Sequence, residues 1–206
     1  MTERIPSYSG RSISLLSPRA EDLCIEDMIL SLARTPRFNG QTLGRINEIY
    51  SVAQHAVLLS YLVPQKEAFS ALIHNLHTAT IGEIISPVKG LIGDPFLGLK
   101  NIHQAQIHQH FDLIWPQATK TRMAIEAANR TALNIEKRDL FHQPKFNSKV
   151  YRDDTKPAQI DPVDLGDLAM LFPIAPLQPS AGYELFSNRF NQLCRSEQQL
   201  EFTRHA

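Results

Sequence analysis

The sequence predicts an all-α fold: a compact helical bundle with a short β-hairpin near its amino-terminal end and a helix at the other end. Three observations predict it. Apolar residues recur at intervals of three and four along most of the chain, prolines separate these stretches, and polar–apolar alternation is confined to one short segment. With 206 residues, 43% of them hydrophobic, the chain can bury one core, so we expect a single domain over residues 1–206.

The first two predicted elements are a hairpin and a helix. Polar and apolar residues alternate around Gly10 in Tyr8-Ser-Gly-Arg-Ser-Ile-Ser-Leu-Leu16, which favours a hairpin. The apolar face of the helix that follows consists of Ile25, Met28, Ile29 and Leu32. Thr35-Pro36 ends this helix, because the residue before a proline avoids the helical region. We expect Arg37-Phe-Asn-Gly40 to form a turn.

The next two predicted helices carry polar side chains on apolar faces. One runs over about residues 51–63 and places His55 among apolar neighbours. The other runs over about residues 65–80, with His74-Asn75 on its inner face, and ends near Gly82, a common helix terminator.

The remainder of the chain is predicted to contain three more helices and a final one after an irregular stretch. The expected segments are a short helix over 83–89, a helix from Asp94 to the residues before Pro116, a long helix over 119–141 with Asn129 on its inner stripe, an irregular wrap over 142–180 rich in proline and aspartate, and a last helix over 181–200. The core of the domain is therefore expected within about residues 20–141.

Composition narrows the class of partner. Lysine and arginine number 21, as do aspartate and glutamate, so the chain lacks the basic footprint of a protein that binds duplex nucleic acid. The amino terminus has no apolar signal core, and no apolar run approaches the ~18 residues of a membrane span. Cys24 and Cys194 are far apart and fit no metal or redox spacing. We expect a cytoplasmic protein, without a membrane partner, whose anionic ligand is small.

Three polar groups on separate helices form the candidate site. They are His55, His74-Asn75 and Asn129, and the acidic Glu83 follows closely after Gly82. Burying an unpaired amide costs about 1–3 kcal/mol. Each group therefore needs a partner, and the simplest partner is another member of the set.

Several short motifs then occur in an order that resembles a known family. They are Arg37-Phe-Asn-Gly40, Tyr50-Ser-Val-Ala-Gln-His55, Ala71-Leu-Ile-His74, Ile81-Gly-Glu-Ile84 with Pro87-Val-Lys89, and Asn134-Ile-Glu-Lys-Arg-Asp-Leu140. This pattern resembles the HD-domain phosphohydrolase superfamily, especially its small bacterial nucleotidase-like members. The resemblance covers residues 7–141 and implies an HD-domain-like helical bundle. Similar proteins often form dimers, so a homodimer is an expected assembly.

The resemblance also implies roles for individual residues. Members of this family hold a divalent metal with two histidines, which fall here on His55 and His74, and two aspartates, which fall on Asn75 and Asn129. A glutamate that activates water in the family falls on Thr78.

Three further residues complete the carried-over site. Glu83 remains as an acid of the catalytic set, and Arg37 and Lys89 match positions that face the substrate phosphate in similar proteins. If the family geometry holds, these two cations line one cleft with the two histidines, and the expected ligand is a nucleotide or another phosphate compound.

The replaced carboxylates bear on metal binding. Two amides leave a divalent cation short of two compensating charges, and Mg²⁺ and Mn²⁺ prefer carboxylates. We expect a divalent transition metal (Zn²⁺, Ni²⁺, Mn²⁺ or Co²⁺) to bind weakly or to be absent. As an alternative, His77 lies three residues after His74 and is a candidate substitute ligand beside His55, with or without Glu83.

Three functions remain open from the sequence. The first is a binder of nucleotides or other phosphates with impaired or lost catalysis. The second is an active phosphohydrolase of the nucleotidase type with an altered metal site. The third is a non-catalytic scaffold or interaction protein.

Overall fold

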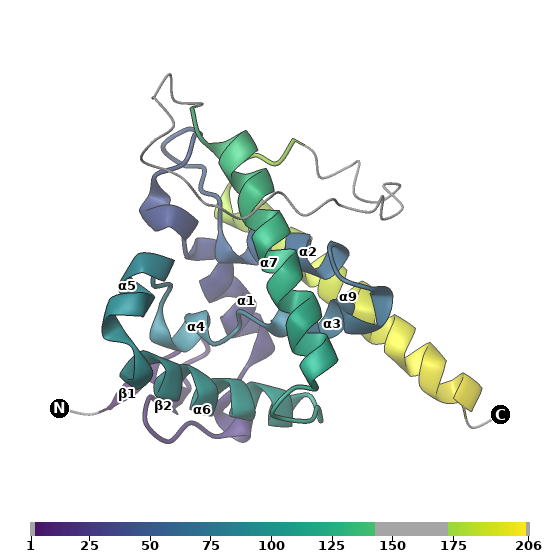
Figure 1. The fold of residues 1–206 in the computed structure, drawn as a ribbon. Coiled ribbons are helices and arrows are strands. Elements are labelled where there is room, and N and C mark those ends of the chain that lie inside the picture. The colour runs from purple at the N-terminus through teal and green to yellow at the C-terminus, as the bar shows by residue number, and fades with distance from the viewer. Residues whose placement is uncertain (1–2, 143–172, 205–206) are drawn as a thin grey trace.

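The computed structural model describes residues 3–142 and 173–204, and it confirms the predicted fold class: a mostly helical bundle with an amino-terminal two-stranded hairpin and a carboxy-terminal helix (Figure 1). Most of the irregular wrap predicted over 142–180 lies outside the described residues. Among the described residues, none of the helices has both the length and the apolar character that crossing a membrane requires.

The hairpin docks on the first helix. Strand β1 (Arg4–Pro6) pairs antiparallel with β2 (Ser12–Ser14). The hairpin therefore begins before residue 8, where the predicted segment starts. Gly10 in the connecting turn has a φ of 84°, a conformation that glycine adopts without steric penalty. Ser9 donates from its backbone N–H and its hydroxyl to Asp27 of α1 (Ile25–Arg34), which fixes the turn to the bundle.

Helix α2 (Val52–Tyr61) is the centre of the core. All of its residues except the last are buried, as expected of a helix that is apolar on most sides. A capping box starts it, in which the Ser51 hydroxyl accepts from the Gln54 N–H and the Gln54 side chain accepts from the Ser51 N–H. This helix carries His55, so its start and burial fix the position of that imidazole.

The predicted helix over residues 65–80 is wrong as a continuous element. The structure divides it into η3 (Gln65–Glu67), α3 (Ala68–Ile73) and α4 (Thr78–Ile81), with turns between α3 and α4. Side chains donate to two backbone carbonyls at this break. The His74 carbonyl accepts from the His77 ring and from Gln104, and the Asn75 carbonyl accepts from the Thr78 hydroxyl.

The remaining elements surround these. They are η1 (Ala20–Asp22), η2 (Arg37–Gly40), α5 (Ser86–Ile92), α6 (Asp94–His110), α7 (Thr119–Leu140) and α9 (Pro179–Arg204). The short helix thus begins later than the predicted residue 83, and the last helix extends beyond the predicted 181–200 at both ends.

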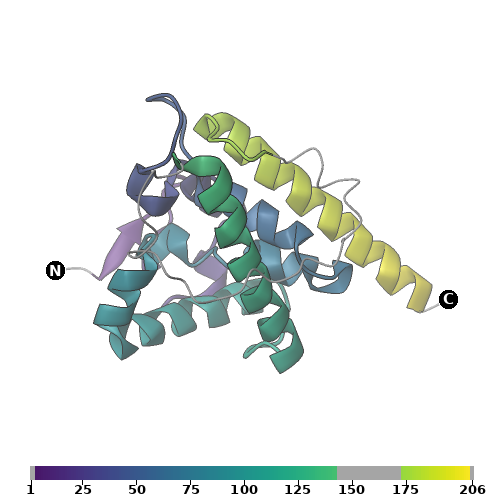
Figure 2. The same ribbon diagram turned by 45° about the horizontal axis from the view of Figure 1, so that its top comes forward.

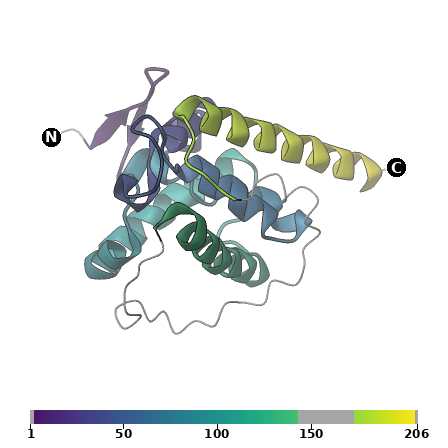
Figure 3. The ribbon, with the colours of Figure 1, turned by 90° about the horizontal axis from the view of Figure 1, so that it is seen from above.

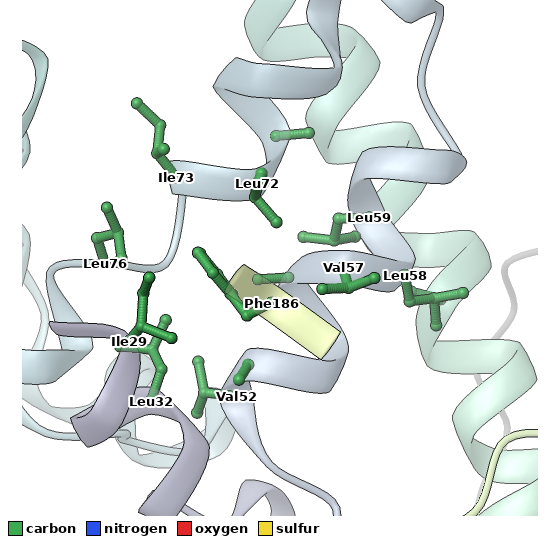
Figure 4. Close-up of a cluster of buried hydrophobic side chains, with 14 of the residues drawn as sticks. Ile29, Leu32, Val52, Val57, Leu58, Leu59, Leu72, Ile73, Leu76 and Phe186 are labelled. Atoms are coloured by element: carbon green, nitrogen blue, oxygen red, sulfur yellow. The ribbon is translucent and has the colours of Figure 1, made fainter. Parts of the chain in front are cut away.

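Helices α2 and α3 lie between α7 and α9 (Figures 1 and 3). Figure 2 shows α5 and α6 on the side of the bundle away from α9. Phe186 of α9 is fully buried and points among leucines of the core, including Leu59 and Leu72 (Figure 4). Arg189 of the same helix donates to the Ser60 hydroxyl and carbonyl at 2.9 and 3.1 Å, which adds a polar attachment to α2.

Candidate functional site

His55 lies between two side chains of α7. Its Nδ1 is 2.6 Å from Glu136 Oε1, and its Nε2 is 3.2 Å from Asn129 Oδ1. The imidazole is 2% exposed and the Glu136 carboxylate is fully buried. Both ring nitrogens are therefore occupied by protein atoms. Of the predicted site residues, His55 and Asn129 are brought into direct contact.

Glu136 is the hub of the buried network, and no role for it was predicted from the sequence. Its Oε1 also accepts from the Tyr50 hydroxyl at 3.0 Å, and its Oε2 accepts from Arg37 Nη2 at 3.1 Å. Burial by itself raises the pKa of Glu136, but the charge and hydrogen bond of His55, followed by the charge of Arg37, outweigh it and lower that pKa.

A signal for Glu136 was present in the sequence. It lies seven residues after Asn129 and four after Ala132, on the same stripe of α7 that was predicted to face inward. A carboxylate at such a position needs a partner, because burying an unpaired charge is far more costly than burying an amide. Tyr50, the partner of Glu136, is also buried. Its burial raises the pKa of its hydroxyl well above the usual value, and the negative charge of Glu136 raises it further.

Asn129 is fully engaged within the protein. Its amide oxygen faces His55, and its Nδ2 donates to the Ile125 carbonyl at 3.0 Å. Both the oxygen and the nitrogen of the amide thus have protein partners, and one of these partners is His55, another member of the predicted set.

His74-Asn75 lies at the break between α3 and α4. Within the described part of the chain, His74 Nδ1 and Asn75 Nδ2 are buried without a hydrogen-bond partner. Burial lowers the pKa of His74 to about 3, with Lys100 as the next cause, so the ring is neutral at physiological pH. An unsatisfied buried donor costs about 1–3 kcal/mol, which makes Asn75 Nδ2 an unusual feature.

The side chains of Thr78 and His77 form hydrogen bonds with backbone carbonyls of this turn. The Thr78 hydroxyl donates to the Asn75 carbonyl at 2.8 Å, and His77 Nδ1 lies 3.0 Å from the His74 carbonyl. Burial, followed by the charge of Lys100, holds the pKa of His77 well below its usual value. Both side chains are therefore explained by local structure.

Arg37, Glu83 and Lys89 form a second polar group linked to the first. Glu83 Oε1 lies 3.6 Å from Arg37 Nη1 and 4.0 Å from Lys89 Nζ. Arg37 joins the two groups, because it also contacts Glu136. The backbone places it there: Phe38 and Asn39 both have a φ of 52°, and the Arg37 N–H donates to the Tyr50 carbonyl at 2.8 Å.

Lys89 and Lys100 add positive charge on the same side of the site as Glu83. Burial lowers the pKa of Lys89, and Glu83 opposes that effect only in part. Burial also lowers the pKa of Lys100, with the charge of Lys89 as the next cause. Lys100 was not predicted from the sequence, where no motif marks it.

The donor set fits a divalent metal poorly. Across residues 3–142 and 173–204, no group of three or more His, Cys, Asp or Glu side chains is arranged to hold a metal ion. The alternative set of His55, His74 and His77 forms no such group, and the His74 and His77 ring centroids are 6.5 Å apart. Two amides replace the carboxylates that such a cation prefers.

Fold and site together define a helical protein with a buried His–Glu–Arg network beside a group of cations. No known family model matches the chain. It is 33% identical over 190 residues to the uncharacterized protein YfdR of Escherichia coli (strain K12), covering 92% of this chain and 94% of YfdR. It is also 33% identical over 135 residues to the uncharacterized protein RCAP_rcc00048 of Rhodobacter capsulatus, covering 62% of this chain and 68% of that protein. The chain therefore belongs to the same family as YfdR. Neither relative's name assigns an activity.

Proposed function

We propose that this protein is an HD-superfamily phosphohydrolase homologue that binds a nucleotide or another phosphate compound and whose catalysis is impaired or lost. The observation that carries the proposal is the state of His55. Its Nδ1 contacts Glu136, and its Nε2 contacts the Asn129 amide, which stands where the resembled family has a carboxylate ligand. An amide at that position supplies no negative charge to compensate a divalent cation. In the resembled family this histidine is a metal ligand.

The loss of metal chemistry removes the nucleophile. A bound divalent metal lowers the pKa of its water and so makes hydroxide at neutral pH. Thr78 stands at the position of the family's water-activating glutamate. Its hydroxyl donates a hydrogen bond to the Asn75 carbonyl. Glu83, the remaining acid, lies against Arg37 and Lys89 instead of standing free as a base.

Anion binding survives the same changes. Arg37 and Lys89 occupy positions that the resemblance assigns to the substrate phosphate, and both lie beside Glu83. Charge-assisted hydrogen bonds from such cations to phosphate need no catalytic group. The replacement of carboxylates by Asn75 and Asn129 removes negative charge that would repel a phosphate.

The test combines elemental analysis with ligand binding. Purified protein is analysed for transition metals, and its melting temperature is measured with inorganic phosphate, nucleoside mono- and triphosphates, and the matching nucleosides. A ligand at 100 times its dissociation constant stabilises a protein by ~2.7 kcal/mol, so a binder is readily detected. We expect little metal and a shift that requires phosphate.

A variant of Lys89 locates the binding. Lys89→Gln should reduce the phosphate-dependent shift, whereas Lys66→Gln, which removes an exposed lysine of η3, should not. Stoichiometric metal with turnover of a nucleotide would replace the proposal with the active phosphohydrolase. The absence of any shift with every phosphate compound would leave the scaffold function.

Other features of the proposal follow from composition and resemblance. We place the protein in the cytoplasm and expect no membrane partner. Its charges balance at 21 of each sign, which argues against duplex nucleic acid as a partner. A homodimer remains the proposed assembly, on the resemblance alone.

A further inference from the structure

We infer that Lys100 of α6 and the side-chain amide of Asn75 complete, with Lys89, a site that holds the terminal phosphate of a phosphate monoester by direct contact, without a bridging metal. This inference rests on the proposed function and deepens it, because it names the class of ligand and two residues that bind it.

The face of α6 places Lys100 at this site. Phe96, Lys100 and Gln104 are four residues apart and so lie along one face of the helix. The ring of Phe96 is 5.7 Å from Lys89 Nζ, and Gln104 Nε2 donates to the His74 carbonyl at 2.9 Å. Lys100 therefore starts between a residue that contacts Lys89 and a residue that contacts His74.

The charge of Lys100 is not neutralised by a close partner. Among the described residues, its ammonium makes no ion pair or hydrogen bond, although Glu83 and Glu126 act on it at longer range. The nearest acid of the group, Glu83, is shared by Arg37 and Lys89. A half-buried lysine beside a second partly buried lysine is stabilised when an anion binds both.

Two of the predicted site residues, Asn75 and Arg37, each carry a buried nitrogen without a hydrogen-bond partner among the described residues. Asn75 Nδ2 can only donate, and it is buried without a partner in the described residues. Arg37 Nε is likewise buried without a partner in the described residues, and it too can only donate. An oxygen-rich anion supplies the acceptors that the protein itself does not.

A phosphate monoester suits this set better than a carboxylate does. Its terminal group has three non-bridging oxygens, enough to accept from Lys89, Lys100 and the Asn75 amide together. An aspartate at position 75 would repel that group unless a cation lay between them. The neutral amide permits direct contact, so the change that weakens metal binding also makes a metal-free phosphate site feasible.

The experiment measures binding of inorganic phosphate and adenosine monophosphate to the full chain by calorimetry in the presence of EDTA, with adenosine as the unphosphorylated control. Lys100→Gln and Asn75→Asp should each raise the dissociation constant at least tenfold, which corresponds to 1.4 kcal/mol. Lys100→Arg should stay within a few fold of the parent. Lys120→Gln, an exposed lysine of α7, should have no effect.

The outcomes separate failure of the Lys100 and Asn75 site from failure of phosphate binding as a whole. If the parent binds phosphate and Lys100→Gln binds it equally well, this inference is overturned and the proposed function stands. If EDTA abolishes binding by the parent, contact is through a metal and the inference also fails. If the parent binds none of the phosphate probes, the proposed function itself fails. Because Lys100→Gln removes a repulsion with Lys89, its melting temperature without phosphate should equal or exceed that of the parent. A folded variant therefore makes the binding result decisive.

Discussion

His55 Nδ1 and Glu136 Oε1 lie 2.6 Å apart, and both side chains are almost completely buried. These residues are separated by 81 positions in the chain, and their contact joins α2 to α7. The carboxylate also accepts from Tyr50 and Arg37, so one buried acid joins three side chains from different parts of the chain.

Removal of Glu136 should therefore be strongly destabilising. Glu136→Ala leaves His55, Tyr50 and Arg37 without their shared acceptor, and breaking a buried charged pair in this way costs about 3–5 kcal/mol. Urea unfolding followed by circular dichroism measures the loss. Glu126→Ala, an exposed change on the same helix, should stay within about 0.5 kcal/mol of the parent. Equal effects from the two variants would contradict the role given to Glu136.

Restoring both carboxylates should restore metal binding. Asn75→Asp combined with Asn129→Asp returns the two charges that a divalent cation requires. We expect the double variant to bind Mn²⁺ in calorimetry and to retain metal in elemental analysis, while either single variant binds more weakly. An unchanged metal content in the double variant would show that these residues are not the ligand positions.

Stability should fall as the solution is acidified below about pH 6.5, and His103 should account for part of that fall. Its Nδ1 lies 3.0 Å from Thr80 Oγ1 and its Nε2 lies 2.9 Å from the Leu15 carbonyl. Burial lowers the pKa of His103 below the usual 6.5, and the hydrogen bond to Leu15 opposes this shift only in part. Below pH 6.5 the unfolded chain therefore binds a proton more readily than the native state, and stability is lost as pH falls towards the lowered pKa.

The measurement for His103 is the free energy of unfolding between pH 7.5 and pH 5. Since a glutamine carries no titrating proton, His103→Gln should show a shallower fall than the parent over that range. The buried His74, His77 and His108 also have lowered pKa values, so the slope should shrink without vanishing. A slope identical to that of the parent would exclude a contribution from His103.

The start of α2 should contribute measurably to stability. The Ser51 hydroxyl accepts from the Gln54 N–H at 3.2 Å, and Ser51→Ala removes this cap at a typical cost of about 0.5–2 kcal/mol. Because α2 carries His55, the variant tests whether the local cap supports the site. Ser86→Ala, at the exposed start of α5, serves as the control and should have an effect near zero. Thermal unfolding of the three proteins compares them directly.

Periodicity predicted most of the helices well. The pattern of Ile25, Met28 and Leu32 with a following proline predicts α1 almost to the residue, because burial on one face and a helix stop are both local signals. The break at His74 was not predicted, because it depends on a contact with a residue far away in the chain. Gln104, which takes the His74 carbonyl, comes from another helix, and no local pattern shows that it will arrive there.

By itself, the sequence determined the helical class, the hairpin, and the placement of His55 and Asn129 on inward faces, since these follow from spacing along one segment. Only the tertiary structure decided that Glu136 would take His55 Nδ1, that Asn75 Nδ2 would be left unpaired, and that Lys100 would lie towards Lys89 and His74. The physical reason is that a face is set by 3.6 residues per turn, whereas a partner is set by how helices far apart in the chain pack together.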